Sequence, residues 1–443
     1  MAKVPAPKPF SLAIVGGGIT GLVLAISLTQ QNISITLYES SSKFGEIGAG
    51  VGFGPNAVKA MQLISPGIMA GFRRCQTEQF ESKRKIWFSV SVGDCRKAGD
   101  EDQGFEYAGR TGNKVEDELF EIPYTNIEGT GGVGGVHRAR FLDELVSLIP
   151  PDIARFRKRL VDVTSAEDGS GDAVLHFADG TTAQHTAVLG CDGIKSQTRK
   201  VLLGGDECGP VFTGKCAHRG LIPMTKAIEL LGEERANNSQ IYFGYHSHIL
   251  TFPIDRGKTM NVVAFASYKT WNSPHWVVQA SHDQRNGDFV NYGPAVKALV
   301  AAMELSTIWA LFDHPPAPTY YGTRPRVCLV GDAAHASTPH QGAGAGMGIE
   351  DCYILGNLIG DAVSAEDLER AFKAYDEIRR PRTQNLVTTS REAGMLWDFE
   401  LESDDLDAIE KNMRSRMQWI WNIDLEVELQ KAKDIFHEDK VPT

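Results

Sequence analysis

Three glycines near the N-terminus have the spacing that a dinucleotide diphosphate requires. Gly16, Gly18 and Gly21 fill the positions of G-x-G-x-x-G. In this pattern the first glycine permits a tight turn, the second admits a pyrophosphate to the backbone, and the third allows a helix to pack closely on a strand. A helix that begins at such a turn offers free N–H groups and a partial positive charge to an anion. These residues therefore predict a dinucleotide site.

The flanking residues predict the elements that would position this turn. The apolar run 11–15 is typical of a buried parallel strand, and 22–28 has the composition of a helix. A second strand at 33–39 ends in Glu39, where a ribose hydroxyl needs an acceptor. The glycine pattern occurs again at 129–134, but without a buried strand before it or an acidic partner after it, so we expect a loop there.

Two more carboxylates follow buried strands. Asp192 comes after the run 183–189 and Asp332 after 326–330, at the carboxyl edge where α/β sheets bind ligands. An Asp-Gly turn is the alternative for Asp192. The glycine-rich segment 339–348 precedes a helix from 349, and this geometry predicts an anion or oxyanion site.

Two other stretches suggest contact with a cofactor. The segment 45–57 is rich in glycine, which indicates that its backbone is held close to a ligand. The alternative is an ordinary loop. Arg138 lies near the start of the helical pattern 137–145, where it suits a phosphate or simply points into solvent.

The rest of the chain predicts more sheet. The runs 159–163, 173–177 and 183–189 have the turn chemistry of a three-stranded meander. Between 209 and 318 several strands follow each other without helical intervals, which predicts an antiparallel sheet. Its inward aromatic side chains could line a site for a flat ligand or belong to the core: Tyr242, Phe252 and Phe265.

Composition limits the class of protein. The chain has 443 residues and a net charge of −11, which argues against a nucleic-acid or anionic-membrane surface. Its seven scattered cysteines contain no C-x-x-C, so neither a disulfide framework nor a metal site is expected. No signal peptide or membrane helix is predicted, and we expect a cytoplasmic enzyme.

Together the motifs around Gly16, Asp192 and Asp332 resemble the class A flavoprotein monooxygenases, which are built like para-hydroxybenzoate hydroxylase. The resemblance covers residues 11–390 and is closest to the salicylate hydroxylase branch, which includes fungal hydroxylases of phenolic polyketides. It implies an α/β fold in which a Rossmann-like FAD-binding domain (1–84, 131–208 and 319–395) is interleaved with an antiparallel substrate domain (85–130 and 209–318). Residues 396–443 would add a C-terminal helical segment.

The resemblance also implies roles for single residues. The fingerprint glycines and Glu39 would hold the ADP half of FAD, and the Asp192 segment would serve both FAD and NAD(P)H. Other residues would contact the diphosphate, the ribityl chain or the isoalloxazine: Gly50, Arg138, Asp332, Pro339, Gly342, Gly344 and Ala345.

The implied reaction uses NADH or NADPH, O₂ and a flavin C4a-hydroperoxide to oxygenate a phenol. Arg219 is the candidate for binding the carboxylate or phenolate of a small aromatic substrate. Tyr242 and His248 are candidates for positioning its ring, and both could equally be core residues. Simple, decarboxylative and dearomatising hydroxylation all remain open, as do NADH or NADPH and a monomer or homodimer.

Other functions share parts of this pattern. Trp419-Ile420-Trp421 superficially resembles a flavin halogenase signature, but Asp424 stands where proline belongs and no matching lysine is found. A flavin epoxidase or a non-catalytic flavin-binding protein would carry similar FAD motifs, and substrate-stimulated NAD(P)H oxidation would exclude the non-catalytic protein. Near the C-terminus, an amphipathic helix at 368–375, a basic patch at 379–382 and an acidic helical tail from Trp397 are expected.

Overall fold

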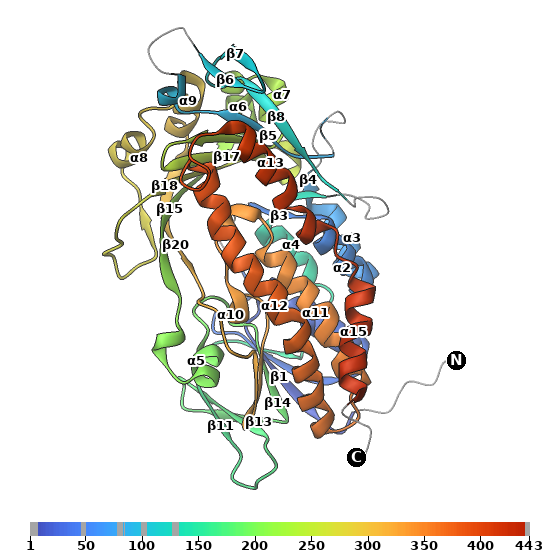
Figure 1. Ribbon diagram of the computed structural model, residues 1–443. Coiled ribbons are helices and arrows are strands. Elements are labelled where there is room, and N and C mark those ends of the chain that lie inside the picture. The colour runs from blue at the N-terminus through green and yellow to red at the C-terminus, as the bar shows by residue number, and fades with distance from the viewer. Residues whose placement is uncertain are drawn as a thin grey trace.

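A largely parallel sheet of six strands carries the N-terminal glycine turn (Figure 1). The computed structural model describes residues 8–45, 50–77, 83, 85–98, 104–125 and 133–438. Within this sheet only the edge strand β21 runs antiparallel to its neighbour. In spatial order the strands are β10 (Ala154–Arg155), β2 (Ser34–Tyr38), β1 (Ser11–Val15), β14 (Ala187–Gly190), β22 (Arg326–Leu329) and β21 (Tyr321–Thr323).

Helices and a three-stranded meander pack around this sheet, and together they enclose one continuous hydrophobic core. The helices of this part are α1 (Ile19–Gln30), α2 (Pro55–Ile64), α3 (Pro66–Cys75), α4 (Arg138–Val146), α5 (Gln197–Leu203), α10 (Asp332–His335) and α11 (Gly344–Asp361). The meander consists of β11 (Leu160–Ser165), β12 (Ala173–Phe177) and β13 (Thr182–His185). The expectation of one strand at 183–189 was wrong, because the backbone leaves the meander at Thr186, whose N–H bonds Ser11, and β14 joins the parallel sheet.

An eight-stranded sheet forms the other half of the molecule. Every pairing in it is antiparallel except that of β16 with β5. One face packs against α6 (Met224–Leu231) and α9 (Pro294–Ala301). The spatial order is β19 (Val277–Gln279), β20 (Glu304–Asp313), β15 (Val211–Pro223), β18 (Thr259–Ser267), β17 (Ser247–Ile254), β16 (Gln240–Gly244), β5 (Ile86–Val92) and β8 (Glu118–Pro123).

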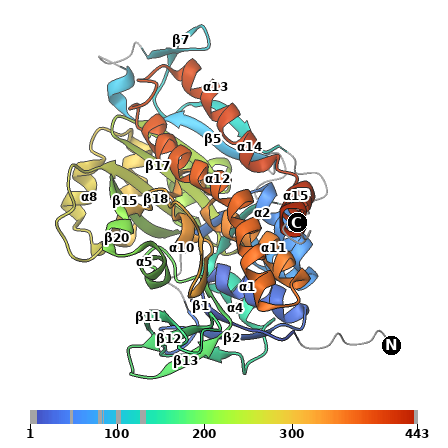
Figure 2. The same cartoon turned by 60° about the horizontal axis from the view of Figure 1, so that its bottom comes forward.

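Helix α12 (Ala365–Trp397) connects the two halves (Figure 2). Its N-terminal part packs in the core of the parallel sheet, and its C-terminal part packs in the core beneath the second sheet. The helix is 33 residues long and passes through Pro381, so it extends far beyond the predicted 368–375. The chain then continues through α13 (Leu406–Arg416), α14 (Gln418–Trp421) and α15 (Leu425–Glu438).

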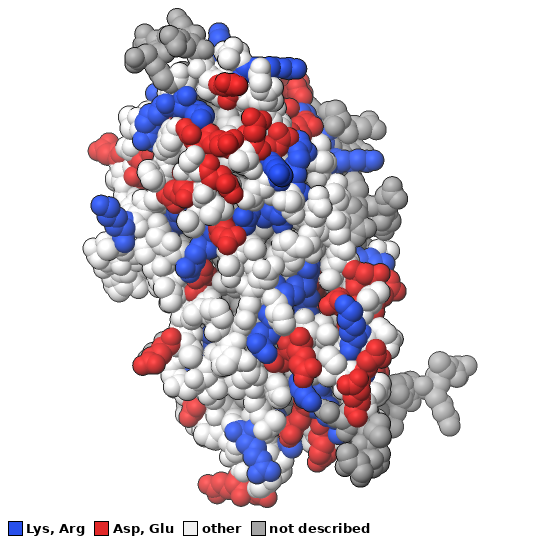
Figure 3. All heavy atoms as spheres, in the orientation of Figure 1, with Lys and Arg blue, Asp and Glu red and all other residues white. Residues whose placement is uncertain are grey.

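Shorter elements fill the space around the sheets. β3 (Gly50–Phe53), β9 (Gly134–His137) and β4 (Gln76–Thr77) form a small sheet, and β6 (Phe105–Tyr107) pairs with β7 (Arg110–Asn113). The short helices α7 (Glu233–Ala236) and α8 (His282–Asp288) lie in the segments between the large-sheet strands. Residues 46–49 of the first glycine-rich stretch and 129–132 of the second lie outside the described residues. On the face seen in Figure 3, acidic and basic side chains are interspersed. None of the described helices is both long enough and apolar enough to cross a membrane.

Candidate active site

The three sequence motifs meet at one edge of the parallel sheet. Val15 of β1 is paired with Gly190 of β14, and Gly190 is paired in turn with Leu329 of β22. The turns that follow these strands therefore lie side by side at the carboxyl edge, as the sequence predicts.

Two of the fingerprint glycines are required because they lie in close contact with backbone. A Cβ on Gly16, whose φ is +104°, would lie 2.3 Å from the carbonyl oxygen of Cys191. A Cβ on Gly21 would lie 2.0 Å from the carbonyl oxygen of Gly16. Glu39 lies beside this turn, where its Oε2 accepts a hydrogen bond of 2.8 Å from the N–H of Gly17. A close backbone turn at the start of α1, with a carboxylate beside it, fits the diphosphate and ribose of FAD.

A cavity of about 560 Å³ lies between this region and the second sheet. Its floor includes the N-terminal end of α11, an 18-residue helix. The first N–H groups of this helix can bind the polar edge of a ligand. Eight of the predicted cofactor or catalytic residues line it: Gly50, Arg138, Arg219, Asp332, Pro339, Gly342, Gly344 and Ala345. Gly16, Gly18, Gly21 and Glu39 are not among its lining residues, as expected if they hold the far end of a long cofactor.

The opposite wall of the cavity is apolar and aromatic. Strand alternation places one set of side chains from β17, β18 and β20 on this wall: Leu250, Phe252, Val263, Phe265, Trp309 and Leu311. The predicted placement of Phe252 and Phe265 agrees with this wall. Such a surface suits a flat aromatic ring.

Arg219 is the cation in this wall. It lies on β15, and its guanidinium carbon is 4.8 Å from the ring centre of Trp309. Its Nε is buried without a hydrogen-bond partner, and the side chain forms no ion pair with any described residue. Burial, and after it the charge of Arg138, lower the pKa of Arg219 to about 10, so the group stays cationic at neutral pH. An unpaired cation beside an apolar wall has the chemistry to bind a carboxylate.

Tyr242 lies outside this cavity. Its side chain is buried on the other face of the sheet, among residues that include Tyr292 and Met303. A strand alternates its side chains between the two faces, so Tyr242 points away from the wall that Leu250 and Phe252 form. Its predicted role in positioning a substrate ring therefore does not fit the structure.

Two other predicted residues lie near the cavity but do not line it. His248 is fully buried behind Phe265, with 4.4 Å between the two ring centres. Asp192 directs its carboxylate at the start of α5, where it accepts hydrogen bonds from the N–H groups of Gln197 and Thr198 at 2.8 and 3.0 Å. Two later residues of the same segment, Ile194 and Lys195, line the cavity instead.

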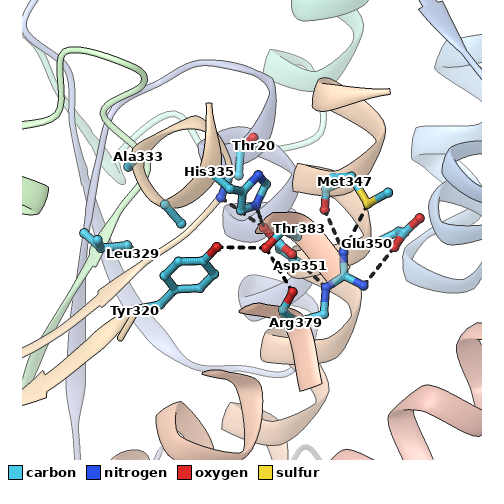
Figure 4. Close-up of polar contacts among 12 residues, drawn as sticks. Thr20, Tyr320, Leu329, Ala333, His335, Met347, Glu350, Asp351, Arg379 and Thr383 are labelled. Atoms are coloured by element: carbon cyan, nitrogen blue, oxygen red, sulfur yellow. Dashed lines mark hydrogen bonds and ion pairs between the residues drawn. The ribbon is translucent and has the colours of Figure 1, made fainter. Parts of the chain in front are cut away.

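A buried ionic cluster behind the cavity was not predicted (Figure 4). Asp351 of α11 accepts hydrogen bonds from Nε of Arg379 at 2.8 Å and from the N–H of Gly331 at 3.1 Å, and its Oδ2 lies 2.6 Å from Nε2 of His335. Burial raises the pKa of Asp351, but His335 and Arg379 outweigh it and hold the pKa well below its usual range. The cluster therefore fixes the turn that presents Asp332 to the cavity.

The cluster continues toward the cavity through Glu350. This carboxylate is ion-paired with Arg379 at 2.8 Å and with Arg382 at 2.9 Å. It also accepts a hydrogen bond of 2.6 Å from Asn56, which lines the cavity. The expectation of a basic patch at 379–382 was wrong, because Arg379 and Arg382 are covered and paired with α11. The feature of the sequence that could have indicated this buried cluster is the adjacent Glu350-Asp351 pair within an apolar helix.

The C-terminal segment contributes an aromatic end to the cavity. Trp421 of α14 lines it together with Trp87 and Tyr124, at ring-centre distances of 5.5 and 4.9 Å. Arg382 fixes this segment by donating hydrogen bonds to the carbonyl oxygens of Trp419 and Ile420. The sequence singled out Trp421 only for a halogenase-like pattern, and nothing local in it predicted a cavity wall.

Comparison with known proteins agrees with this site. Residues 314–390 match a family described as an FAD binding domain, and 14–49 match an NAD(P)-binding Rossmann-like domain. The chain is 41% identical to 6-methylsalicylate 1-monooxygenase atA of Aspergillus terreus, over 96% of this chain and 92% of the relative. A salicylate hydroxylase of Pseudomonas putida is 36% identical, over 98% and 95%. A solved salicylate hydroxylase substrate complex has a TM-score of 0.81 at 34% identity, and the match covers 96% of this chain and 98% of the other.

Proposed function

Since the chain belongs to the FAD-dependent aromatic monooxygenases of the salicylate hydroxylase branch, we propose that it hydroxylates a salicylate-like phenol whose carboxylate binds Arg219. FAD is the cofactor, with NAD(P)H and O₂ as co-substrates. When bound, FAD accepts hydride from NAD(P)H and activates O₂ for transfer of one oxygen atom. The protein binds, orients and shields the reactants.

The proposed cofactor contacts run from the glycine turn at the start of α1 into the cavity. The turn at Gly16 and the carboxylate of Glu39 would hold the ADP half, while Arg138 and Asp332 would contact the diphosphate and ribityl groups. The backbone from Pro339 to Ala345 would meet the isoalloxazine, with free N–H groups of α11 directed at its polar edge.

One observation supports the substrate class more than any other: Arg219 is cationic and unpaired in an aromatic wall. A benzoate-type substrate supplies an anion for Arg219 and a ring for the aromatic wall. Its carboxylate can take two N–H donors while its ring packs on apolar side chains. A carboxylate held there also fixes which ring carbon faces the cofactor side of the cavity. The apolar wall excludes water from the reacting atoms.

We infer that the reaction is decarboxylative. Oxygen adds at the carbon that bears the carboxylate, the bond from that carbon to the carboxylate carbon breaks, and CO₂ leaves while the electron pair stays on the ring. Two similar proteins are named for salicylates, and one of them for oxygenation at position 1, which bears the carboxylate in a salicylate. Phenolate formation favours this step because it makes the carbon ortho to the oxygen nucleophilic.

The test is substrate-stimulated oxidation of NADH and NADPH by the FAD-loaded protein. Salicylate and 6-methylsalicylate are compared with benzoate, which lacks the phenol, and with phenol, which lacks the carboxylate, while O₂, peroxide and CO₂ are followed. Stimulation by the salicylates alone, with CO₂ and little peroxide, is expected. Stimulation without CO₂ would indicate simple or dearomatising hydroxylation, and no stimulation by any phenol would contradict the proposed function.

A further inference from the structure

We propose that Trp87, Tyr124 and Trp421 form a subsite for an apolar substituent of the substrate, carried on the ring carbon opposite the one that bears the carboxylate. The preferred substrates are then salicylates with an alkyl chain at that carbon, rather than salicylate itself. This inference rests on the proposed function, because binding of the carboxylate to Arg219 determines where the ring lies. It deepens that function by naming the class of phenol.

The charged and the apolar side chains of the cavity lie at different ends. Four of the described lining residues are charged, and they belong to the parallel-sheet half of the molecule or to β15: Arg138, Lys195, Arg219 and Asp332. The lining residues from β5, from α14 and from the position after β8 are aromatic: Trp87, Phe88, Tyr124 and Trp421. A cavity with a cation at one end and an apolar surface at the other fits an amphipathic ligand.

The two ends are too far apart for one ring to reach both. Strands β18, β17 and β16 lie between β15, which carries Arg219, and β5, which carries Trp87. At about 4.8 Å between neighbouring strands, this separation is roughly 19 Å. Figure 2 agrees, with α14 beside β5 and β20 at the other side of the sheet. A salicylate bound to Arg219 therefore leaves the aromatic end uncovered, and a substituent opposite the carboxylate points toward it.

An apolar surface connects the two ends. Val263 of β18 and Leu250 of β17 line the cavity between Arg219 and Trp87. An alkyl chain that follows this surface covers apolar side chains and removes no charged group from water. Each methylene that reaches the surface therefore adds to the affinity for the substrate without a desolvation cost.

Contacts between distant parts of the chain fix the shape of the aromatic end. The ring centre of Trp421 lies 5.5 Å from that of Trp87 and 4.9 Å from that of Tyr124. The following residues are joined as well, because Oγ1 of Thr125 donates a hydrogen bond of 2.8 Å to Oδ1 of Asn422. Aromatic pairs at these distances stabilise one arrangement of the rings. A preformed apolar subsite binds a chain at a lower entropic cost than one that must first become ordered.

The experiment measures affinity against chain length. The FAD-loaded protein, without NAD(P)H, is titrated in a calorimeter with salicylate and with its 4-methyl, 4-propyl and 4-pentyl derivatives, whose chains leave the ring opposite the carboxylate. Kd should fall about two- to fourfold for each added methylene. The control is 6-pentylsalicylate, which carries the same chain beside the carboxylate and should gain little affinity over salicylate.

Variants at the two edges of the sheet locate the chain. Trp421→Ala should remove most of the gain in affinity from 4-methylsalicylate to 4-pentylsalicylate. Tyr124→Ala, at a partly buried residue of the same subsite, should reduce this gain as well and covers failure of the first variant to fold. Trp276→Ala is the matched control, because Trp276 lines the cavity next to β19, at the opposite edge of the sheet, and it should keep the full dependence on chain length.

The outcomes separate the subsite from the proposed function. Affinity that does not depend on chain length in the wild type, or that rises equally with a 4-pentyl and a 6-pentyl chain, would overturn the subsite and leave the proposed function intact. An unchanged dependence in the folded Trp421 and Tyr124 variants would also overturn it, and weaker FAD binding in them would show that the aromatic end holds the cofactor instead. Failure of every salicylate in the series to bind or to stimulate NAD(P)H oxidation would contradict the proposed function and the subsite with it.

Discussion

At the scale of single residues, Arg219 connects stability to substrate choice. A guanidinium taken out of water without an anionic partner lowers the stability of the fold. Its contact with Trp309 recovers only about 0.5 to 2 kcal/mol. A bound carboxylate would restore the missing hydrogen bonds, so this residue exchanges some stability for affinity toward an anion.

Replacing Arg219 by Gln should raise KM for salicylate. A hydrogen bond to a charged group contributes about 1.5 to 3 kcal/mol, which corresponds to roughly 10- to 100-fold in KM. Methyl salicylate, which keeps the phenol but has no carboxylate, serves as the control, and its binding should change little. Equal weakening for the acid and the ester, measured by steady-state kinetics and fluorescence titration, would contradict carboxylate binding at Arg219.

A second residue prediction concerns the fingerprint turn. Gly16→Ala places a Cβ against the Cys191 carbonyl and should abolish FAD binding, because the turn must open. Gly180→Ala is the matched control, since Gly180 also has a positive φ but no atom within 4 Å of an added Cβ. The control should keep its FAD and lose only about 1 to 2 kcal/mol of stability. Flavin content of the purified variants and urea unfolding measure the two effects.

At the scale of elements, α11 and α12 hold the cavity in place through buried charges. Arg379 contributes to this from the middle of α12, although it lies in a run of arginines that suggests an exposed patch. Its carboxylate partner Asp351 lies 28 residues earlier in the chain. Local sequence gives no sign of such a pairing, because it depends on how two helices pack.

Arg379→Met should destabilise the protein strongly. Removing one partner of a buried ion pair typically costs about 3 to 5 kcal/mol, because the remaining charge is left uncompensated. Both Asp351 and Glu350 would lose that partner. The double variant Arg379→Met, Asp351→Asn should recover part of the loss, and the free energy of unfolding in urea measures it. A double variant no more stable than the single one would show that the charge on Asp351 is not the cause.

The first two strands of the parallel sheet and the glycine turn between them could be predicted because their signals are local. Gly16 and Glu39 mark their places through turn chemistry and strand alternation within a single βαβ unit. The face on which Tyr242 lies could not be predicted, because both faces of its sheet are covered and every side chain of β16 is buried. Trp421 was missed for a related reason, since its contacts with Trp87 and Tyr124 join segments that are about 300 residues apart in the chain.

At the scale of the whole molecule, the structure keeps several histidines neutral inside both halves. Burial lowers the pKa of His314 to about 3, with the Arg199 charge adding to the effect. His340 and His248 are shifted in the same direction for the same main reason. In the unfolded chain each of them titrates near pH 6.5.

Stability should therefore fall as the pH drops below about 6.5. Between that value and the lowered pKa of the folded state, the unfolded chain binds more protons, so protonation favours unfolding. Each such histidine contributes a slope of about 1.4 kcal/mol per pH unit, and the stability is fully present above pH 6.5. Urea unfolding at saturating FAD between pH 7.5 and 5 measures the slope of stability against pH. His314→Gln should reduce that slope by the contribution of about one proton. A flat profile over this range would contradict neutral burial of these rings.

The most direct test of decarboxylative hydroxylation uses 6-methylsalicylate labelled with ¹³C in its carboxylate. The FAD-loaded protein with NADH or NADPH should release one labelled CO₂ for each O₂ and each reduced nucleotide consumed, and should form a catechol. Arg219→Gln should lose this reaction at low substrate concentration. Two results would contradict decarboxylative hydroxylation at this site. In the first, oxygen is consumed but the label stays on an aromatic product; in the second, oxygen consumption yields only peroxide.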